Sequence, residues 1–242
     1  MTERVAWVTG GSGGIGRAIV EHLAARGDTV AVLDPAAADP PEAAAASIRC
    51  DVGDPAQVEA AAAELVAALG PAEILVNCAA ISARAPVGEM SLATWEAVLR
   101  INLTGAFLCT AAVVDGMRRA GWGRVVSVAS GSGVRPTAGT SAYAASKAGL
   151  IAMTKAVALE VALDGITANV VAPGIVDTPM TRKSWPTDAD MLAMATSSPI
   201  ANPMGRVLSP DDIALAVVWL ASDDARHVTG QTLHVNAGSL MP

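Results

Sequence analysis

Short runs of apolar and β-branched residues alternate along this chain with longer stretches of helical periodicity. Glycine, proline or a charged residue bounds each short run, which is typical of strands buried on both faces of a sheet. The runs that predict strands are residues 5–9, 29–34, 48–51, 73–77, 124–130, 166–172 and 231–235. The stretches that predict helices are residues 14–26, 55–69, 91–119, 142–163 and 210–221. The alternation predicts an α/β fold: a single doubly wound, Rossmann-type domain over residues 1–242, with a parallel sheet of about seven strands and helices on both faces.

Two segments interrupt this alternation. After Asp34, the sequence PAAADPPEAAAA holds three prolines, which leaves little room for a regular crossover helix and predicts a short or irregular segment. From residue 179 to 206 the periodicity fails because prolines recur, while the Met and Trp content is high for a polar loop. Long loops of this kind are usually functional, so we predict a substrate lid at about residues 179–206.

The predicted lid contains candidates for contacts with a substrate. Met180, Trp185 and Met191 are candidates for an apolar wall. Arg182 or Lys183 is a candidate for contact with an anionic group. The alternative is a set of surface helices in which these two cations are only solvated.

Composition and charge exclude several classes of protein. Hydrophobic residues make up 52% of the chain, yet glycine, charge or proline interrupts each apolar stretch before bilayer length, so no membrane partner is expected. The first ten residues predict a strand and a glycine turn, not a signal peptide, which indicates a cytoplasmic protein. A net charge of -7 disfavours nucleic acid. Three widely spaced cysteines and three scattered histidines indicate neither disulfides nor a metal site.

The sequence VTGGSGGIGRAIV joins the first predicted strand to the first predicted helix. Its spacing T-G-x-x-x-G-x-G, through Thr9, Gly10, Gly14 and Gly16, is much more specific than the G-x-G-x-x-G pattern that it also contains. Glycines let the backbone approach a pyrophosphate, to which the helix N-terminus offers free N–H groups and a partial positive charge. The turn predicts a dinucleotide cofactor; the alternative is a glycine-rich turn without a ligand.

Asp34 closes the second predicted strand, about twenty residues beyond the glycine turn. A carboxylate there can accept hydrogen bonds from both hydroxyls of the adenosine ribose, and it would repel a 2′-phosphate. Residue 13 in the turn is Gly, and no Arg or Lys follows Asp34 directly, so a site for NADP lacks its usual cation. The sequence therefore predicts NAD as the cofactor.

The chain contains a single tyrosine, Tyr143, and one of its three lysines, Lys147, follows four residues later. On a helix the two side chains would share a face. A phenol is a poor base at neutral pH, but a nearby ammonium favours the phenolate and lowers the phenol's pKa. The pair therefore predicts a group that exchanges a proton; the alternative is an ordinary helix pair.

With these features and the further motifs below, the chain resembles the classical short-chain dehydrogenase/reductase (SDR) family over nearly its entire length. TGGSGGIG at 9–16 is similar to the family's cofactor turn, CDV at 50–52 to its adenine-binding pair, NCAA at 77–80 to its N-[NS]-A-G strand end, INLTGAF at 101–107 to its central helix and PGIVDT at 173–178 to its nicotinamide-contacting segment. Ser130 precedes Tyr143 by the family's usual thirteen residues. The chain departs from the pattern at Cys78 and Ala80, which replace Asn and Gly, and at NAG 236–238, where D-G-G is common.

This resemblance implies a role for each matching residue. The cofactor-binding residues that it implies are Gly10, Ser12, Gly14, Ile15, Gly16, Asp34, Asp51, Val52, Asn77, Ala79, Tyr143, Lys147, Pro173, Gly174, Val176 and Thr178. The catalytic residues that it implies are Asn102, Ser130, Tyr143 and Lys147. Tyr143 would act as general acid and base, and Lys147 would also bind the nicotinamide ribose. Asn102 would hold a water that links the lysine to solvent, and Ser130 would donate a hydrogen bond to the substrate oxygen.

The leading hypothesis is an NAD-dependent oxidoreductase that interconverts a secondary alcohol and a ketone by hydride transfer. A second enzyme hypothesis is a reductase of 3-oxoacyl thioesters, although such enzymes usually favour NADPH and dock an acidic carrier on a basic surface. A hypothesis from another class is a non-catalytic dinucleotide sensor or scaffold. The family pairs the helices predicted at 91–119 and 142–163 between subunits, which implies a homotetramer, with a dimer as the next choice.

Overall fold

The computed structural model describes residues 3–35, 40–198 and 200–242. Its centre is a parallel sheet of seven strands in the order β3-β2-β1-β4-β5-β6-β7, which confirms the predicted doubly wound fold. The strands are β1 (Val5–Thr9), β2 (Thr29–Asp34), β3 (Ala46–Arg49), β4 (Ile74–Asn77), β5 (Gly123–Val128), β6 (Ile166–Pro173) and β7 (Thr232–Val235). In the register, Trp7 of β1 lies between Ala31 of β2 and Leu75 of β4.

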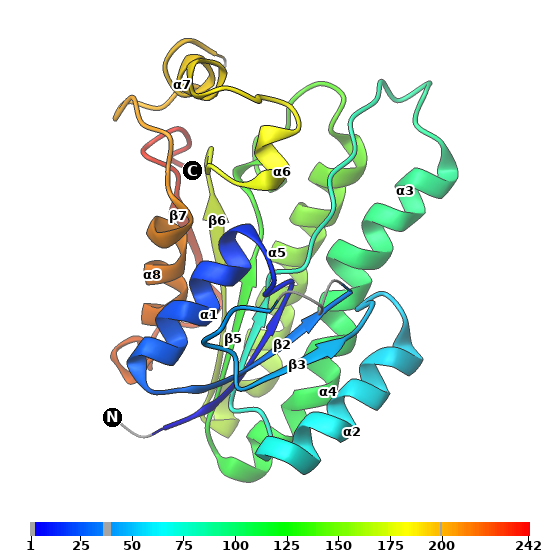
Figure 1. Ribbon diagram of the computed structural model, residues 1–242, viewed down its shortest axis with the longest axis vertical. Helices are drawn as coiled ribbons and strands as arrows, with labels where there is room; N and C mark the ends of the chain where they lie inside the picture. The colour runs from blue at the N-terminus through cyan, green and yellow to red at the C-terminus, as the bar shows by residue number, and fades with distance from the viewer. Residues whose placement is uncertain (1–2, 36–39, 199) are drawn as a thin grey trace.

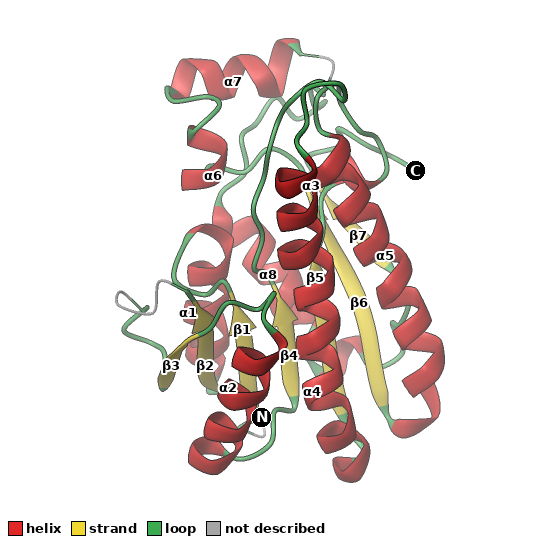
Figure 2. Ribbon diagram, turned by 90° about the vertical axis from the view of Figure 1, so that its right-hand side faces the viewer, coloured by secondary structure: helices red, strands yellow, loops and turns green. Residues whose placement is uncertain are grey.

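Helices cover both faces of this sheet (Figure 1). They are α1 (Gly14–Arg26), α2 (Pro55–Leu69), α3 (Leu92–Leu99), α4 (Gly105–Ala120), α5 (Ser141–Val161), α6 (Pro179–Arg182), α7 (Asp188–Ser197) and α8 (Pro210–Leu220). Buried residues of α1 and α8, such as Ile19 and Ile213, pack on one face. Those of α2, α4 and α5, such as Leu65, Val113 and Ala158, pack on the other (Figure 2). Strand residues alternate between the two cores, as Val8 and Trp7 do.

The helical run Leu92–Ala120 is interrupted by a π-helical turn at Arg100–Thr104. Within the described ranges, this run alone is long and apolar enough to cross a membrane, contrary to the expectation that every apolar stretch ends short. One face of α4 belongs to the core, where Cys109, Val113 and Met117 are buried. On the other face Phe107 is exposed. The helix is apolar on both faces: its inner face packs in the core, and its outer face is exposed.

The prolines between residues 179 and 206 suggested a continuous loop. The segment instead contains two helices, α6 and α7. Each of these helices begins with a capping box, Thr178 with Thr181 and Thr187 with Asp190. Figure 1 shows both helices beyond the carboxyl ends of the strands. The segment after Asp34 contains no helix in its described residues, and residues 36–39 of that prediction lie outside them.

Candidate active site

The site lies at the carboxyl ends of β1, β4, β5 and β6. The sheet order reverses between β1 and β4, since the chain crosses from β1 outward to β2 and β3 and then returns to β4 on the other side. In open α/β sheets, ligands bind in the crevice outside such a switch point. The glycine turn follows β1, and the loops after β4, β5 and β6 meet it there.

Close packing explains the glycines that follow β1. Gly10 has a positive φ of 68°, and a Cβ on it would lie 2.8 Å from the Cα of Ala79, in the loop after β4. A Cβ on Gly16 would lie 2.0 Å from the carbonyl oxygen of Gly10. Thr9 ties the same two loops together, because its Oγ1 accepts hydrogen bonds from the backbone N–H groups of Cys78 and Ala79, both at 3.0 Å. The turn is therefore held tightly against the end of β4.

A cavity of about 470 Å³ extends from this turn across the carboxyl edge of the sheet. It is lined by every residue predicted to bind the cofactor except Asn77, namely Gly10, Ser12, Gly14, Ile15, Gly16, Asp34, Asp51, Val52, Ala79, Tyr143, Lys147, Pro173, Gly174, Val176 and Thr178. Two observations fit a dinucleotide. The first turn of α1 has no side-chain cap, which leaves its N–H groups for a pyrophosphate. The Oγ of Ser12 is buried at the cavity wall without a hydrogen-bond partner among the described residues.

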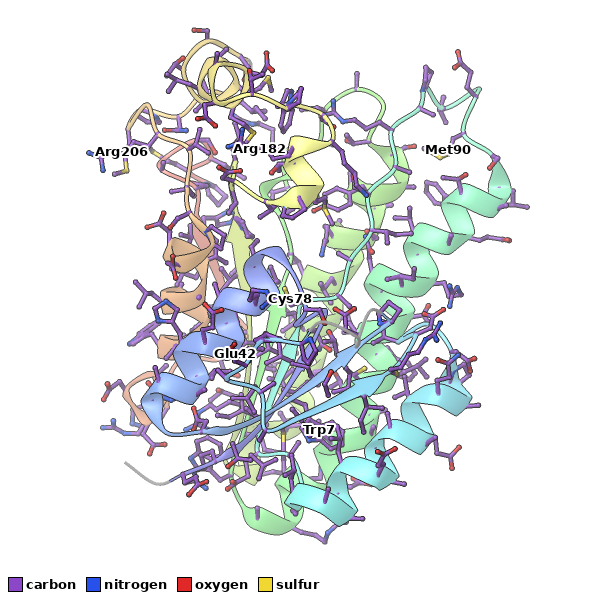
Figure 3. All side chains as sticks on the ribbon, in the orientation of Figure 1. Trp7, Glu42, Cys78, Met90, Arg182 and Arg206 are labelled. Atoms are coloured by element: carbon purple, nitrogen blue, oxygen red, sulfur yellow. The ribbon has the colours of Figure 1, made fainter. Side chains whose placement is uncertain are left out.

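Asn77 lies at the end of β4, beneath this cavity and not in its lining. Its Nδ2 donates to Oγ1 of Thr110 on α4 at 3.1 Å, while its Oδ1 is buried and has no partner in the part of the chain that the structure describes. The neighbouring Cys78 does line the cavity, and Figure 3 shows it close to the start of α1. Burial raises the pKa of the Cys78 thiol to about 11, so this substitution for the family's Asn supplies a neutral group beside the cofactor site.

Asp34 is buried at the end of β2, and its Oδ2 accepts a hydrogen bond of 3.2 Å from the backbone N–H of Ser12. The glycine turn therefore orients the carboxylate along the cavity wall. The guanidinium of Arg17, on α1, donates to the carbonyl oxygen of Ser12 at 3.1 and 3.3 Å. Arg17 does not line the cavity, whereas Asp34 does.

The π-helical turn positions Asn102. Its Oδ1 accepts from the backbone N–H of Ile81 at 2.8 Å, and its Nδ2 donates to the carbonyl oxygen of Ile81 at 2.9 Å and to Oγ of Ser146 at 3.1 Å. Ser146 in turn donates to the carbonyl oxygen of Tyr143 at 2.7 Å. Asn102 is thus buried between the loop after β4 and the helix that carries Tyr143. π-Helical turns are frequent at functional sites.

Tyr143 and Lys147 lie one turn apart on α5 and face the cavity. The pKa of the Tyr143 phenol is raised by burial and is lowered in part by a hydrogen bond with Ser130. Burial lowers the pKa of the Lys147 ammonium to about 8. The Nζ of Lys147 donates to the carbonyl oxygen of Val128 at 2.7 Å and lies 5.7 Å from the centroid of the Tyr143 ring. In this structure a hydrogen bond to β5 therefore holds Lys147. The spacing suggested that Lys147 lowers the pKa of Tyr143, but burial dominates and raises that pKa.

A second cavity, of about 170 Å³, adjoins the first and shares part of its lining with it, Tyr143 included. Ser130 and Tyr143 line both cavities, and Ser130 lies directly after β5 as the cap of the short 3₁₀ turn Gly131–Gly133. Met180 and Trp185 of the predicted lid line the second cavity. The phenol is thus placed between a cofactor-sized space and a substrate-sized space.

The other lid residues lie elsewhere. Met191 is buried behind the wall, packed with Ile175 and Ala195, because the inner face of α7 closes its own small core. Arg182 is held by carboxylates, with hydrogen bonds of 2.6 Å to Asp177 and 2.7 Å to Asp188, and Figure 3 shows it between α6 and α7. Neither Arg182 nor Lys183 lines either cavity.

Sequence reasoning missed residues that reach the cavities, most of them from loops. The cofactor cavity is also lined by Ile81, whose backbone bonds to Asn102, and by Ile101, which lies in the π-helical turn and not in a loop. The second cavity is lined by Arg84 and Arg135. No periodicity marks loop residues. Ile101 could have been predicted to line the cavity, because it directly precedes Asn102 in the sequence.

Comparison with known proteins agrees with this geometry. A family model described as enoyl-(acyl carrier protein) reductase matches residues 10–239. The chain is 40% identical over 245 residues to the 3-oxoacyl-[acyl-carrier-protein] reductase FabG of Escherichia coli and 37% identical over 259 residues to the acetoacetyl-CoA reductase of Allochromatium vinosum. These alignments cover 98% of this chain and 98% and 99% of the relatives. The solved structure of the aldohexose dehydrogenase of Thermoplasma acidophilum superposes with a TM-score of 0.91, at 33% identity, covering 98% of this chain and 94% of that one.

The fold and the site define a nicotinamide-dinucleotide oxidoreductase. The chain belongs to the short-chain dehydrogenase/reductase family.

Proposed function

We propose that this protein is an NAD-dependent dehydrogenase that interconverts a secondary alcohol and a ketone, with Tyr143 as general acid and base. The observation that carries the proposal is the position of Ser130 and Tyr143 in the wall between the two cavities. A substrate oxygen bound beside these hydroxyls would place its carbon at the mouth of the cofactor cavity. Bound NAD would accept a hydride from that carbon, or NADH would donate one.

Tyr143 and Ser130 would have different roles in the reaction. Reduction of a ketone leaves an alkoxide that needs a proton, and oxidation of the alcohol needs a base, so one phenol at Tyr143 serves both directions. Ser130 would donate a hydrogen bond to the same substrate oxygen and stabilise the charge that develops there. The presence of both residues in the lining of the same two cavities supports this arrangement.

Lys147 and Asn102 would act through Tyr143. The Nζ of Lys147 is buried and near the phenol, so rotation toward a ribose hydroxyl of the cofactor would bring a positive charge to the place where a phenolate forms. Asn102 bonds both to the loop of Ile81 and to Ser146 on α5, and would thereby fix the position of α5 relative to the cavity. These contacts support catalysis over a non-catalytic sensor, which would not need the phenol, the serine and the lysine at one cavity.

Asp34 supports NAD over NADP. Its buried carboxylate lines the cavity close to the N-terminus of α1, where the ribose of adenosine would lie. A phosphate on that ribose would face this negative charge, and the described cavity wall carries no arginine there.

A second candidate is the reduction of a 3-oxoacyl thioester, which the names of the FabG and acetoacetyl-CoA reductase relatives favour. Asp34 and the net charge of -7 are less suited to NADPH and to an acidic carrier protein. We keep it as the alternative that the assay below must separate.

We also propose a homotetramer that works in the cytoplasm on a small-molecule substrate. Large apolar side chains are exposed on the helices that SDR subunits pair, with Phe107 on α4 and Leu159 on α5, and Leu163 directly after α5. Burial of these side chains against a second copy would remove them from water.

The decisive experiment is a turnover screen of the pure protein. NAD and NADP are each offered with a panel of secondary alcohols, and NADH and NADPH with the matching ketones and with acetoacetyl-CoA. Turnover of alcohols or ketones with NAD(H) is expected. Turnover of acetoacetyl-CoA with NADPH alone would select the thioester reductase, and no turnover of any compound by a folded, NAD-binding protein would select the sensor.

A further inference from the structure

The second cavity has an unusual charge for this acidic protein. Its lining contains two arginines, Arg84 and Arg135, and no Asp or Glu among the described residues. Much of the rest of the wall carries hydroxyl groups, from Ser82, Ser130, Ser132, Thr137, Thr140, Tyr143, Thr181, Ser184 and Ser239. The chain as a whole has a net charge of -7. A cavity with two cations, many hydroxyls and no carboxylate is suited to an anion.

Neutral groups hold both arginines. The Arg84 guanidinium donates to Oγ1 of Thr137 at 3.2 Å and lies 5.8 Å from the centroid of the Trp185 ring. The Arg135 guanidinium donates to the carbonyl oxygen of Ser239 at 2.7 Å. These contacts orient the two guanidinium groups and leave most of their five N–H donors for another acceptor.

The two arginines come from different loops that are hydrogen-bonded to each other. Arg84 follows β4 and Arg135 precedes α5, and the backbone N–H of Ala85 donates to the carbonyl oxygen of Gly139 at 3.0 Å. The bond from Arg84 to Thr137 joins the same loops. The fold therefore brings both cations to the lining of the same cavity, although they are far apart in the sequence.

Several arginines elsewhere in this protein are neutralised, whereas others, such as the exposed Arg206, form no ion pair among the described residues. Arg26, Arg100, Arg118 and Arg182 each form an ion pair with an Asp. Arg84 and Arg135 form no ion pair within the described ranges. Exposed arginines are often only solvated, but two on the wall of the substrate cavity have a different environment.

We infer that Arg84 and Arg135 bind the carboxylate of a small oxo acid and of the corresponding hydroxy acid. The inference rests on the proposed function, because it assigns the second cavity to the substrate. A carboxylate matches the planar fork of a guanidinium and can be held by two N–H groups at once. The cavity of about 170 Å³ is suited to a short acid, with the carboxylate at the arginines and the carbonyl at Ser130 and Tyr143. The phosphates of a coenzyme A thioester are a second source of negative charge, and the test separates the two.

The test compares short 2-oxo and 3-oxo acids with their own methyl esters, which have the same ketone and no charge. In wild-type protein with NADH, we expect kcat/KM for at least one acid to exceed that for its ester by at least about tenfold, or about 1.4 kcal/mol. Arg84→Gln and Arg135→Gln should each lower this ratio mainly by raising KM for the acid. The double variant should remove the preference.

Arg206→Gln is the matched control. Arg206 is exposed, lines neither cavity and projects away from α6 in Figure 3. Its substitution should leave both the rates and the ratio unchanged. Equal loss in all three variants would indicate a general effect of surface charge and would overturn the inference.

The outcomes separate the inference from the proposed function. Turnover of ketones with an acid-to-ester ratio that the arginine variants do not change would overturn the inference and leave the dehydrogenase intact. Dependence on the arginines for acetoacetyl-CoA but not for any free acid would replace the carboxylate by a phosphate. If no compound turns over, calorimetric titration of the oxo acids into NADH-saturated protein decides: binding lost in the double variant supports the inference, and no binding to wild type overturns it.

Discussion

Lys147 and Tyr143 share a face of α5, yet the Nζ of Lys147 donates to the carbonyl oxygen of Val128 and not to the phenol. The lysine is buried, and its pKa is lowered to about 8, while the pKa of Tyr143 is raised by its own burial. In the protein alone, burial therefore shifts both pKa values toward the neutral forms, although Lys147 still carries its positive charge below about pH 8. The charge that makes the phenol a base must come from a change at Lys147 and from the positive nicotinamide when NAD binds.

We predict that NAD lowers the pKa of Tyr143. Because Tyr143 is the sole tyrosine, the ultraviolet change of tyrosinate formation reports one site, and the five tryptophans do not titrate. In the free protein the transition should lie above the usual value of about 10, and in the NAD complex it should lie below it. Lys147→Met should remove most of the downward shift. An unchanged transition on addition of NAD would contradict the proposed role of Lys147.

Removal of the phenol should remove catalysis and leave the cofactor site intact. Tyr143→Phe should lower kcat by at least about 10²-fold, since the general acid and base is lost. Fluorescence titration should show that NADH still binds to the variant. A Tyr143→Phe protein with near-normal kcat would show that this phenol only packs.

Lys147→Met should make the folded protein more stable at neutral pH. The folded-state pKa of Lys147 is lowered to about 8, so between pH 8 and the unfolded value of about 10.4 the unfolded chain binds more protons and wild-type stability rises with pH. Below about pH 8 the full cost of the buried ammonium is present. The variant's Tm should therefore exceed that of the wild type by a few degrees at pH 7, and the difference should shrink toward pH 10. A variant less stable than the wild type at pH 7 would show that loss of the hydrogen bond to Val128 dominates, and a difference that does not shrink with pH would show that the pKa of Lys147 is not lowered.

Wild-type protein should prefer NAD to NADP in kcat/KM by at least about tenfold, or about 1.4 kcal/mol. Asp34→Asn keeps the shape of the side chain and an acceptor for the N–H of Ser12 while it removes the charge. The variant should gain activity with NADP relative to NAD. Comparable use of both cofactors by the wild type would refute the assignment of Asp34.

The segment of α6 and α7 should tighten when cofactor and substrate bind. Trp185 lies at the second cavity and should change its fluorescence, and proteolysis between residues 179 and 198 should slow. Arg182→Ala removes the bond to Asp177 and the bond to Asp188, the second of which connects α6 to α7. The variant should show faster proteolysis and a higher KM with little change in Tm, because exposed ion pairs contribute little to stability. Unchanged fluorescence and cleavage in the ternary complex would rule out a lid.

Sedimentation should show a homotetramer, with a dimer as the next choice. Leu159→Glu places a charge on the exposed apolar face of α5 and should lower the sedimenting mass while the circular dichroism of the fold is retained. A stable wild-type monomer at working concentration would refute the assembly.

Local signals made much of this fold predictable. The bounds of β1, β2, α1 and α2 agree residue for residue with the sequence prediction, because Gly14, Gly27, Pro55 and Gly70 mark the helix ends and Asp54 caps α2. The residues that line the larger cavity were predictable because the glycine turn and the strand ends carry them at fixed spacing.

Other features depend on contacts that no local pattern records. The capping boxes of α6 and α7 are present in the sequence, but the prolines around them suggested a loop. β3 begins two residues before its prediction, because its register with β2 is set across the sheet. Arg84 and Arg135 lie in loops without periodicity, and the bond between Ala85 and Gly139 that brings them together joins distant parts of the chain.

The π-helical turn at Arg100–Thr104 makes the chain one residue longer than a regular helix over this stretch would need. Each residue of an α-helix turns the helix by about 100°, so this extra residue sets the faces of α3 and α4 out of phase. Deletion of a single residue there should still give a continuous helix. In this fold α3 contacts α5, and Asn102 bonds to Ile81. With one residue fewer, the helix could keep only one of these two sets of contacts. A length variant at this turn would therefore fold with its helix content intact and lose the alignment between the two halves of the helix.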